Sequence, residues 1–153
     1  MRRKSVLALA GLVLVSLATE AQTASKSAAP AGPSLYKRLG GYDAIAAVSD
    51  DFIGRMAADK TLARFLVGLS DNSKGHLRQL VVDQLCAATG GPCIYIGRDM
   101  KTAHKGLGIT GADWDLAVTY LVESLDKFKV PEKEKGELLT IASSLKPDIV
   151  EKP

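Results

Sequence analysis

The two histidines of this 153-residue chain, His76 and His104, are its clearest candidates for binding a metal ion. His104 lies in the segment YIGRDMKTAHKGLGIT, where apolar residues flank it and two basic residues, Arg98 and Lys101, precede it. A neutral imidazole in apolar surroundings with cations at the rim suits an iron porphyrin, whose propionates the cations would meet. The motifs HExxH, CxxC, GxSxG and the phosphate-binding glycine loop do not occur in the sequence. The common zinc, hydrolase and nucleotide chemistries therefore lack support.

Composition divides the chain into three parts. Residues 1–21 open with three basic residues and continue as an apolar run of about 14 residues, which predicts a secretory signal peptide. Because this run is short for a bilayer span, we expect an exported, periplasmic protein with no stable membrane anchor after cleavage; the alternative is an uncleaved N-terminal anchor. Residues 22–33 predict a flexible leader and residues 34–151 the folded domain. Without residues 1–21 the formal net charge falls from +3 to +1, so no nucleic-acid partner is expected.

The elements that must position His104 follow from the spacing of apolar residues. These residues recur at steps of three and four, and the runs end at glycines or prolines, as in amphipathic helices. The strict alternation that is typical of strands does not occur, so we expect an all-α domain. Pro147 should kink or end the last helix. The spacing predicts short helical turns near 34–39, 62–66 and 100–105, and longer helices at 43–58, 73–89, 110–128 and 131–146.

Three segments in the same order, SLYKRLGGYDAI, DFIGRMAAD and LCAATGGPCIYIGRDMKTAHKGLGIT, resemble the group I truncated haemoglobins over residues 34–150. The resemblance implies a truncated globin, a two-over-two helical sandwich around a b-type haem. His104 would be the proximal iron ligand and would donate its other N–H to a backbone carbonyl about one turn earlier. The function implied is the reversible binding of a diatomic gas, which is O2, NO or CO. The most specific part of the resemblance is the set Tyr95, Gly97, Met100, Lys101, His104 and Ile109.

The distal side departs from the family. Many members carry a tyrosine directly after the phenylalanine of the second helix, where this chain has Phe52 and Ile53. Counting back from the glycine pair puts Val81 where the family often has glutamine, and Leu77, one turn earlier, where it has glutamine or leucine. We therefore expect an apolar distal wall. The residues expected around the haem are Phe52, Ile53, Phe65, Leu66, Leu77, Val81, Tyr95, Arg98, Met100, Lys101 and Ile109.

Several alternatives stay open. His76 is either a solvated surface residue or a reversible second iron ligand, and the second case would favour a bis-histidine electron-transfer protein. Cys86 and Cys93 are either a disulfide, as an oxidising compartment would favour, or two free thiols. A nitric-oxide dioxygenase or a peroxidase would use the same haem and would need a separate reductase. Because both reactions benefit from polar groups beside the iron, the apolar wall favours a gas-binding protein over an enzyme.

Overall fold

The computed structural model describes residues 32–152; the predicted signal peptide and all but the last two residues of the leader lie outside the described residues. Over this range the chain is helical and forms no β-strand, which confirms the all-α prediction. None of the helices in this range is long and apolar enough to cross a membrane. The elements are α1 (Leu35–Arg38), α2 (Tyr42–Ala58), the 3-10 turn η1 (Ala63–Phe65), α3 (Asp71–Ala88), α4 (Met100–His104), α5 (Gly111–Lys127), α6 (Glu132–Ser144) and α7 (Lys146–Ile149).

Local side chains explain where these helices begin and end. Helix α3 begins two residues earlier than predicted, because the Ser70 hydroxyl accepts a hydrogen bond from the Ser73 N–H and caps the helix. Helix α5 begins with the expected capping box, in which the Thr110 and Asp113 side chains each accept from the other's backbone N–H. Helix α6 ends at Ser144. Helix α7 carries Pro147 in its first turn, where its missing N–H leaves no helical hydrogen bond unmade, so the expected break is confirmed.

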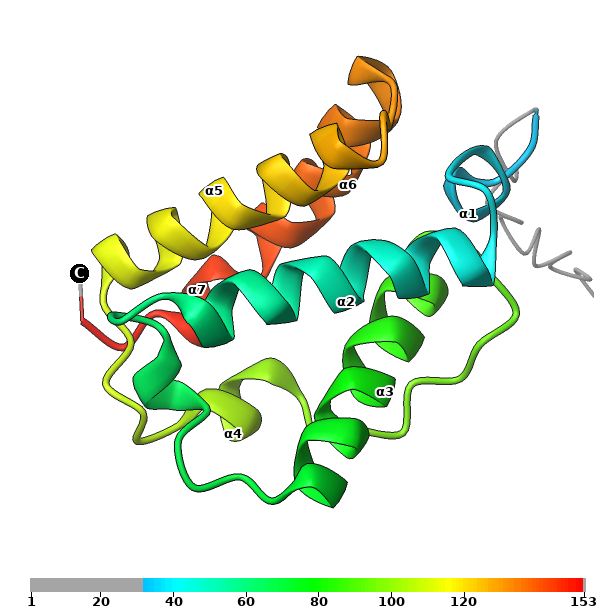
Figure 1. Cartoon of the computed structure of the whole chain (residues 1–153). Helices are drawn as coiled ribbons and strands as arrows, with labels where there is room; N and C mark the ends of the chain where they lie inside the picture. The colour runs from blue at the N-terminus through cyan, green and yellow to red at the C-terminus, as the bar shows by residue number, and fades with distance from the viewer. Residues whose placement is uncertain (1–31, 153) are drawn as a thin grey trace, which may run out of the picture.

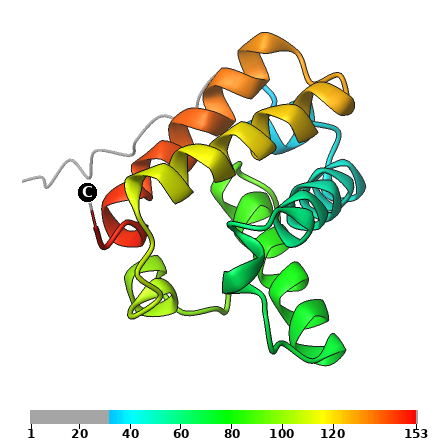
Figure 2. The same cartoon turned by 60° about the vertical axis from the view of Figure 1, so that its left-hand side comes forward.

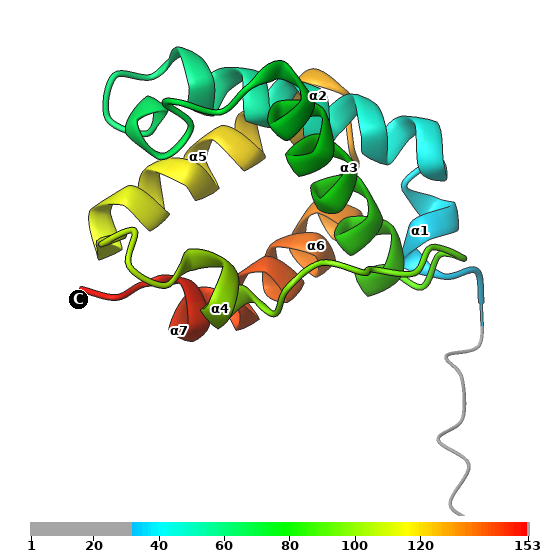
Figure 3. The same ribbon diagram turned by 90° about the horizontal axis from the view of Figure 1, so that it is seen from below.

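The longer helices form two layers. Helix α2 packs against α3 on one side and against α5 on the other, and α5 lies beside α6 (Figures 1 and 2). The arrangement confirms the two-over-two sandwich. Helix α4 lies across from α2, with α3 and α5 to either side, and it packs against α7 (Figure 3).

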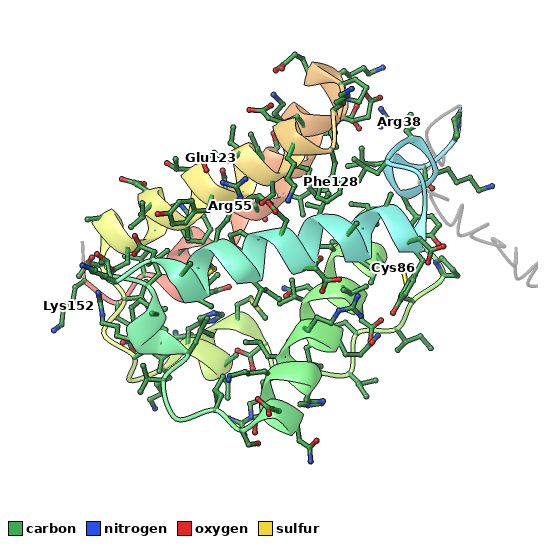
Figure 4. The ribbon with its side chains drawn as sticks, in the orientation of Figure 1. Arg38, Arg55, Cys86, Glu123, Phe128 and Lys152 are labelled. Carbon is green, nitrogen blue, oxygen red and sulfur yellow. A yellow bond between two sulfur atoms is a disulfide. The ribbon has the colours of Figure 1, made fainter. Side chains whose placement is uncertain are left out.

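Most of the buried apolar side chains gather at one end of this sandwich, while Leu62 and Ile109 are buried elsewhere. Those at this end come from the N-terminal half of α2 and from the C-terminal halves of α3 and α5, together with α1 and α6. One cluster is Leu35, Val48, Leu121, Leu125 and Leu138, and a second is Ile45, Ala46, Val82 and Cys86. We call these two clusters the closed core. Cys86 is completely buried there and forms a disulfide with Cys93, which fastens the end of α3 to the segment that leads toward α4 (Figure 4).

The charged side chains between α2 and α5 form a compact network. The Asp51 carboxylate accepts hydrogen bonds from Arg55 (2.6 Å), Lys127 (2.5 Å) and Ser124 (2.8 Å). Arg55 also pairs with Glu123 across the two helices, as the labelled side chains in Figure 4 show. These partners, Arg55 first among them, hold the pKa of Asp51 well below its usual range. The network therefore ties α2 to α5 next to the closed core.

Candidate functional site

The imidazole of His104 ends the five-residue helix α4. This helix is capped at its start by the Asp99 carboxylate, which accepts a hydrogen bond from the Thr102 N–H at 2.8 Å. His104 is half-buried, and its Nδ1 lies 2.8 Å from the carbonyl oxygen of Met100, one turn earlier. Because a carbonyl can only accept, Nδ1 must carry the proton in this hydrogen bond, and Nε2 keeps its lone pair. This is the hydrogen bond expected for a proximal ligand, and it fixes the imidazole tautomer that binds a metal through Nε2.

The half-buried apolar side chains outside the two buried clusters include most of those expected around His104. They lie on the C-terminal part of α2, on η1 and the residue after it, on the first half of α3, on α4 and at the start of α5. We call this set the open end of the sandwich. Its half-buried members that were expected near the haem are Phe52, Ile53, Phe65, Leu66, Leu77, Val81 and Met100. Four residues not expected there, Met56, Leu80, Trp114 and Val118, are half-buried in the same segments, and Phe52 also packs against the closed core. Ile109, also expected near the haem, is buried instead, at 7% exposure.

The expected distal residues Ile53, Leu77 and Val81 carry no hydrogen-bonding group. Ile53 lies on α2, and Leu77 and Val81 lie one turn apart on α3. The amide of Gln79, a polar group on the same stretch of α3, donates to Tyr42 Oη and to Asp83, both at 2.9 Å. These contacts engage the donor of Gln79 away from the three apolar residues.

His76 lies on the first part of α3, where residues 71–76 are all exposed to solvent. An exposed position of this kind fits the solvated alternative. His104, by contrast, is half-buried.

The segment before His104 carries two exposed basic side chains, and a tyrosine fixes the conformation of its loop. Arg98 and Lys101 are both exposed, as cations that meet carboxylates at the edge of a cofactor would be. The Tyr95 hydroxyl donates to the carbonyl oxygen of Arg98 at 2.7 Å, and partial burial raises the pKa of Tyr95. Gly97 lies so close under the Tyr95 ring that any added Cβ would collide with it. The Tyr95 hydroxyl therefore shapes the loop.

Sequence reasoning missed two contacts that hold the segments around His104. The Arg64 guanidinium donates to Asp113 at 2.7 Å, which joins η1 to the start of α5. Hydrogen bonds from Thr110, and then the Arg64 contact, lower the pKa of Asp113. The Glu151 carboxylate accepts from the backbone N–H groups of Gly106 and Gly108. Only the Thr110–Asp113 spacing was a visible signal in the sequence, and it did not reveal the distant partners.

The donors of this site fit a haem. Within residues 32–152, no group of three or more His, Cys, Asp or Glu side chains is arranged to hold a metal ion. A single imidazole with a free Nε2 lone pair suits a metal whose other ligands arrive with its own macrocycle. The half-buried apolar side chains of the open end suit the faces of such a ring, and the exposed Arg98 and Lys101 suit its propionates.

Comparison with known proteins gives consistent matches. The family model described as bacterial-like globin matches residues 34–151. The group 1 truncated hemoglobin GlbN of Mycolicibacterium paratuberculosis is 36% identical over 116 residues, covering 76% of this chain and 83% of that protein. The corresponding GlbN of Synechocystis sp. is 31% identical and covers 72% of this chain and 90% of that protein.

Solved structures show the same likeness. The truncated hemoglobin of Tetrahymena pyriformis in the Fe(III) form is 25% identical, with a TM-score of 0.71 over 77% of this chain and 98% of that one. The 2/2 hemoglobin of a Synechococcus species, solved in the cyanomet state with covalently attached heme, is 29% identical, with a TM-score of 0.70 over the same shares of the two chains.

Proposed function

Because this chain belongs to the bacterial-like globins, among the group 1 truncated haemoglobins, and is therefore a haem protein that binds a diatomic gas, we propose that His104 holds the haem iron and that an apolar distal wall faces the gas. The hydrogen bond from His104 Nδ1 to the Met100 carbonyl oxygen carries this proposal, since it leaves the Nε2 lone pair free to bind the iron. Haem, when bound, supplies a ferrous iron that binds O2, NO or CO reversibly.

The chain's own residues orient and shield that site. The Met100 carbonyl fixes the rotation of the His104 ring and raises the basicity of Nε2. The half-buried apolar side chains of α2, α3 and α5 would exclude water from the faces of a bound ring. Arg98 and Lys101, both exposed, would pair with the propionates.

The distal wall sets the preference among gases. Ile53, Leu77 and Val81 would face the ligand without a hydrogen-bond donor. A donor beside bound O2 would stabilise it by roughly 1–3 kcal/mol in a dry pocket, whereas CO depends much less on such a bond. We therefore propose that this protein binds O2 less tightly than tyrosine-bearing relatives, and binds CO or NO comparatively well.

Two features support an exported, periplasmic location. The composition of residues 1–21 is that of a signal peptide. The Cys86–Cys93 disulfide is a kind of cross-link that persists in oxidising compartments and is rare in reducing ones.

The enzymatic and electron-transfer alternatives have less support. A nitric-oxide dioxygenase or peroxidase would gain from a polar group near the iron, and would draw electrons from a separate reductase. A bis-histidine protein would need His76 at the iron, and His76 is exposed on α3.

Absorption spectra test this assignment. The purified protein, His104→Ala and His76→Ala would be compared in the ferric, ferrous and CO-bound forms. We expect the Soret band of ferrous and CO-bound wild type to be reproduced by His76→Ala, and the histidine-ligated spectrum to be lost in His104→Ala. A His104→Ala protein that retains the wild-type ferrous spectrum would overturn the role of His104. A low-spin six-coordinate ferrous spectrum that disappears in His76→Ala would instead establish bis-histidine ligation.

A further inference from the structure

The C-terminal segment after α7 returns to the loop that follows His104. The backbone N–H groups of Glu151 and Lys152 donate to the carbonyl oxygen of Ile109, at 2.9 and 3.2 Å. The N–H of Gly111 donates in turn to the Lys152 carbonyl at 3.0 Å. The chain end therefore lies beside the connection from α4 to α5, as Figures 1 and 3 show, and α7 itself packs against α4.

A single carboxylate holds the middle of that connection. Glu151 Oε1 accepts from the Gly106 N–H at 2.6 Å, and Oε2 accepts from the Gly108 N–H at 2.5 Å. Both glycines have positive φ, 84° and 65°, a conformation that other residues rarely adopt. This backbone curl turns two N–H groups, two residues apart, toward one anion. These bonds, the one from Gly106 first, lower the pKa of Glu151, so the carboxylate is charged at neutral pH.

The curl begins two residues after His104, the last residue of α4. The Leu107 N–H donates to the His104 carbonyl oxygen at 3.2 Å, which links the curl directly to the backbone of the histidine. A helix of five residues does not hold its own geometry in water, and α4 depends on what fixes its two ends. Asp99 caps the start of α4, and Glu151 fixes the turn after its end.

We propose that Glu151 is a positioning residue for the proximal ligand: its carboxylate fixes the Gly106–Gly108 curl and, through it, the direction in which His104 presents Nε2. This inference rests on the proposed role of His104. It assigns to the C-terminal segment a part in setting the strength of the iron–histidine bond, although Glu151 itself touches neither the iron nor the gas.

The test compares Glu151→Ala and Glu151→Gln with Asp148→Ala, which removes an exposed carboxylate three residues away on α7. The resonance Raman iron–histidine stretch of the ferrous protein and the rate of haem transfer to excess apomyoglobin would be measured well below the unfolding temperature. We expect Glu151→Ala to shift or broaden the stretch and to speed haem loss by about tenfold, as loss of groups that support a metal ligand does. Glu151→Gln should change both in the same direction by less, because its amide keeps one acceptor oxygen.

These readouts separate positioning from folding. A loss of packing alone would lower thermal stability and leave the stretching frequency of the folded protein unchanged. Wild-type stretching frequency and haem loss in both Glu151 variants would overturn the inference, and Glu151→Gln, which keeps the side-chain shape, decides it if Glu151→Ala does not fold. The two claims can be refuted separately. A wild-type spectrum in His104→Ala would overturn the assignment of His104 as the iron ligand. If His104 is established as the ligand and the Glu151 variants behave as wild type, only the positioning role of Glu151 is overturned.

Discussion

Reducing the Cys86–Cys93 disulfide should lower the stability of the whole domain by an amount that the ring size predicts. The two cysteines are seven residues apart. Closing a loop of this length in the unfolded chain corresponds to about 2.4 kcal/mol at 25 °C in the chain-entropy treatment. For a domain of about 118 residues, the unfolding entropy converts this into a fall in Tm of about 10 °C. Reduction changes the free energy of the folded state little, because Cys86 is completely buried and its thiol would stay within the closed core.

Thermal unfolding followed by far-ultraviolet circular dichroism, with and without a phosphine reductant, measures this difference. Because the reductant also reaches the haem iron, Cys93→Ala serves as the matched control. The variant should unfold near the temperature of the reduced wild type and should not respond to the reductant. The change that the reductant causes in the Tm of Cys93→Ala is subtracted from the change that it causes in the Tm of the wild type. A remaining fall of less than about 3 °C would refute the loop-entropy reasoning. The same small shift would follow if the cysteines were unpaired in the isolated protein, which the intact mass before and after reduction distinguishes.

Two further changes test the distal wall and the charged network. Ile53→Tyr should slow O2 dissociation by roughly one to two decades, because it adds a hydrogen-bond donor worth about 1–3 kcal/mol. Ile53→Phe, which lacks the hydroxyl, should not slow it. Equal O2 dissociation rates for the two variants in stopped-flow experiments would place Ile53 away from the gas. Asp51→Asn should lower the free energy of unfolding by roughly 1–3 kcal/mol at neutral pH, measured in urea. Because the pKa of Asp51 is lowered in the folded state, its contribution is present above the unfolded-state value of about 3.9 and is lost as the pH falls below it. The difference between wild type and variant should therefore shrink at acid pH, and a constant difference would contradict the assignment.

Local patterns predicted the elements of this fold well, because helices are governed by neighbours along the chain. The steps of three and four around Leu121 and Leu125, and the capping pair Thr110 and Asp113, specify α5 without any knowledge of its partners. The start of α3 was predicted two residues late, because the periodic residues begin inside the helix whereas the Ser70 cap lies before them.

The site was predictable only in part. The hydrogen bond from His104 to Met100 joins residues four apart, and the resemblance together with helical geometry predicted it. The contacts of Glu151 with Gly106 and Gly108 join residues 45 and 43 positions apart. No short-range pattern encodes such a pair, since it depends on how α7 is brought back against α4. Prediction from sequence is therefore weakest for the groups that support the ligand from a distance.

The separation of the closed core from the open end has a consequence for how such a protein can change. Leu121 and Leu125 belong to the closed core, whereas Ile53 and Leu77 neither belong to its two clusters nor pack against them. Substitutions at well-separated sites add nearly independently in free energy. Exchanges of Ile53 or Leu77, which we propose face the gas, should therefore cost the fold little. The same closed core can therefore support distal walls of different polarity, and with them different affinities for O2.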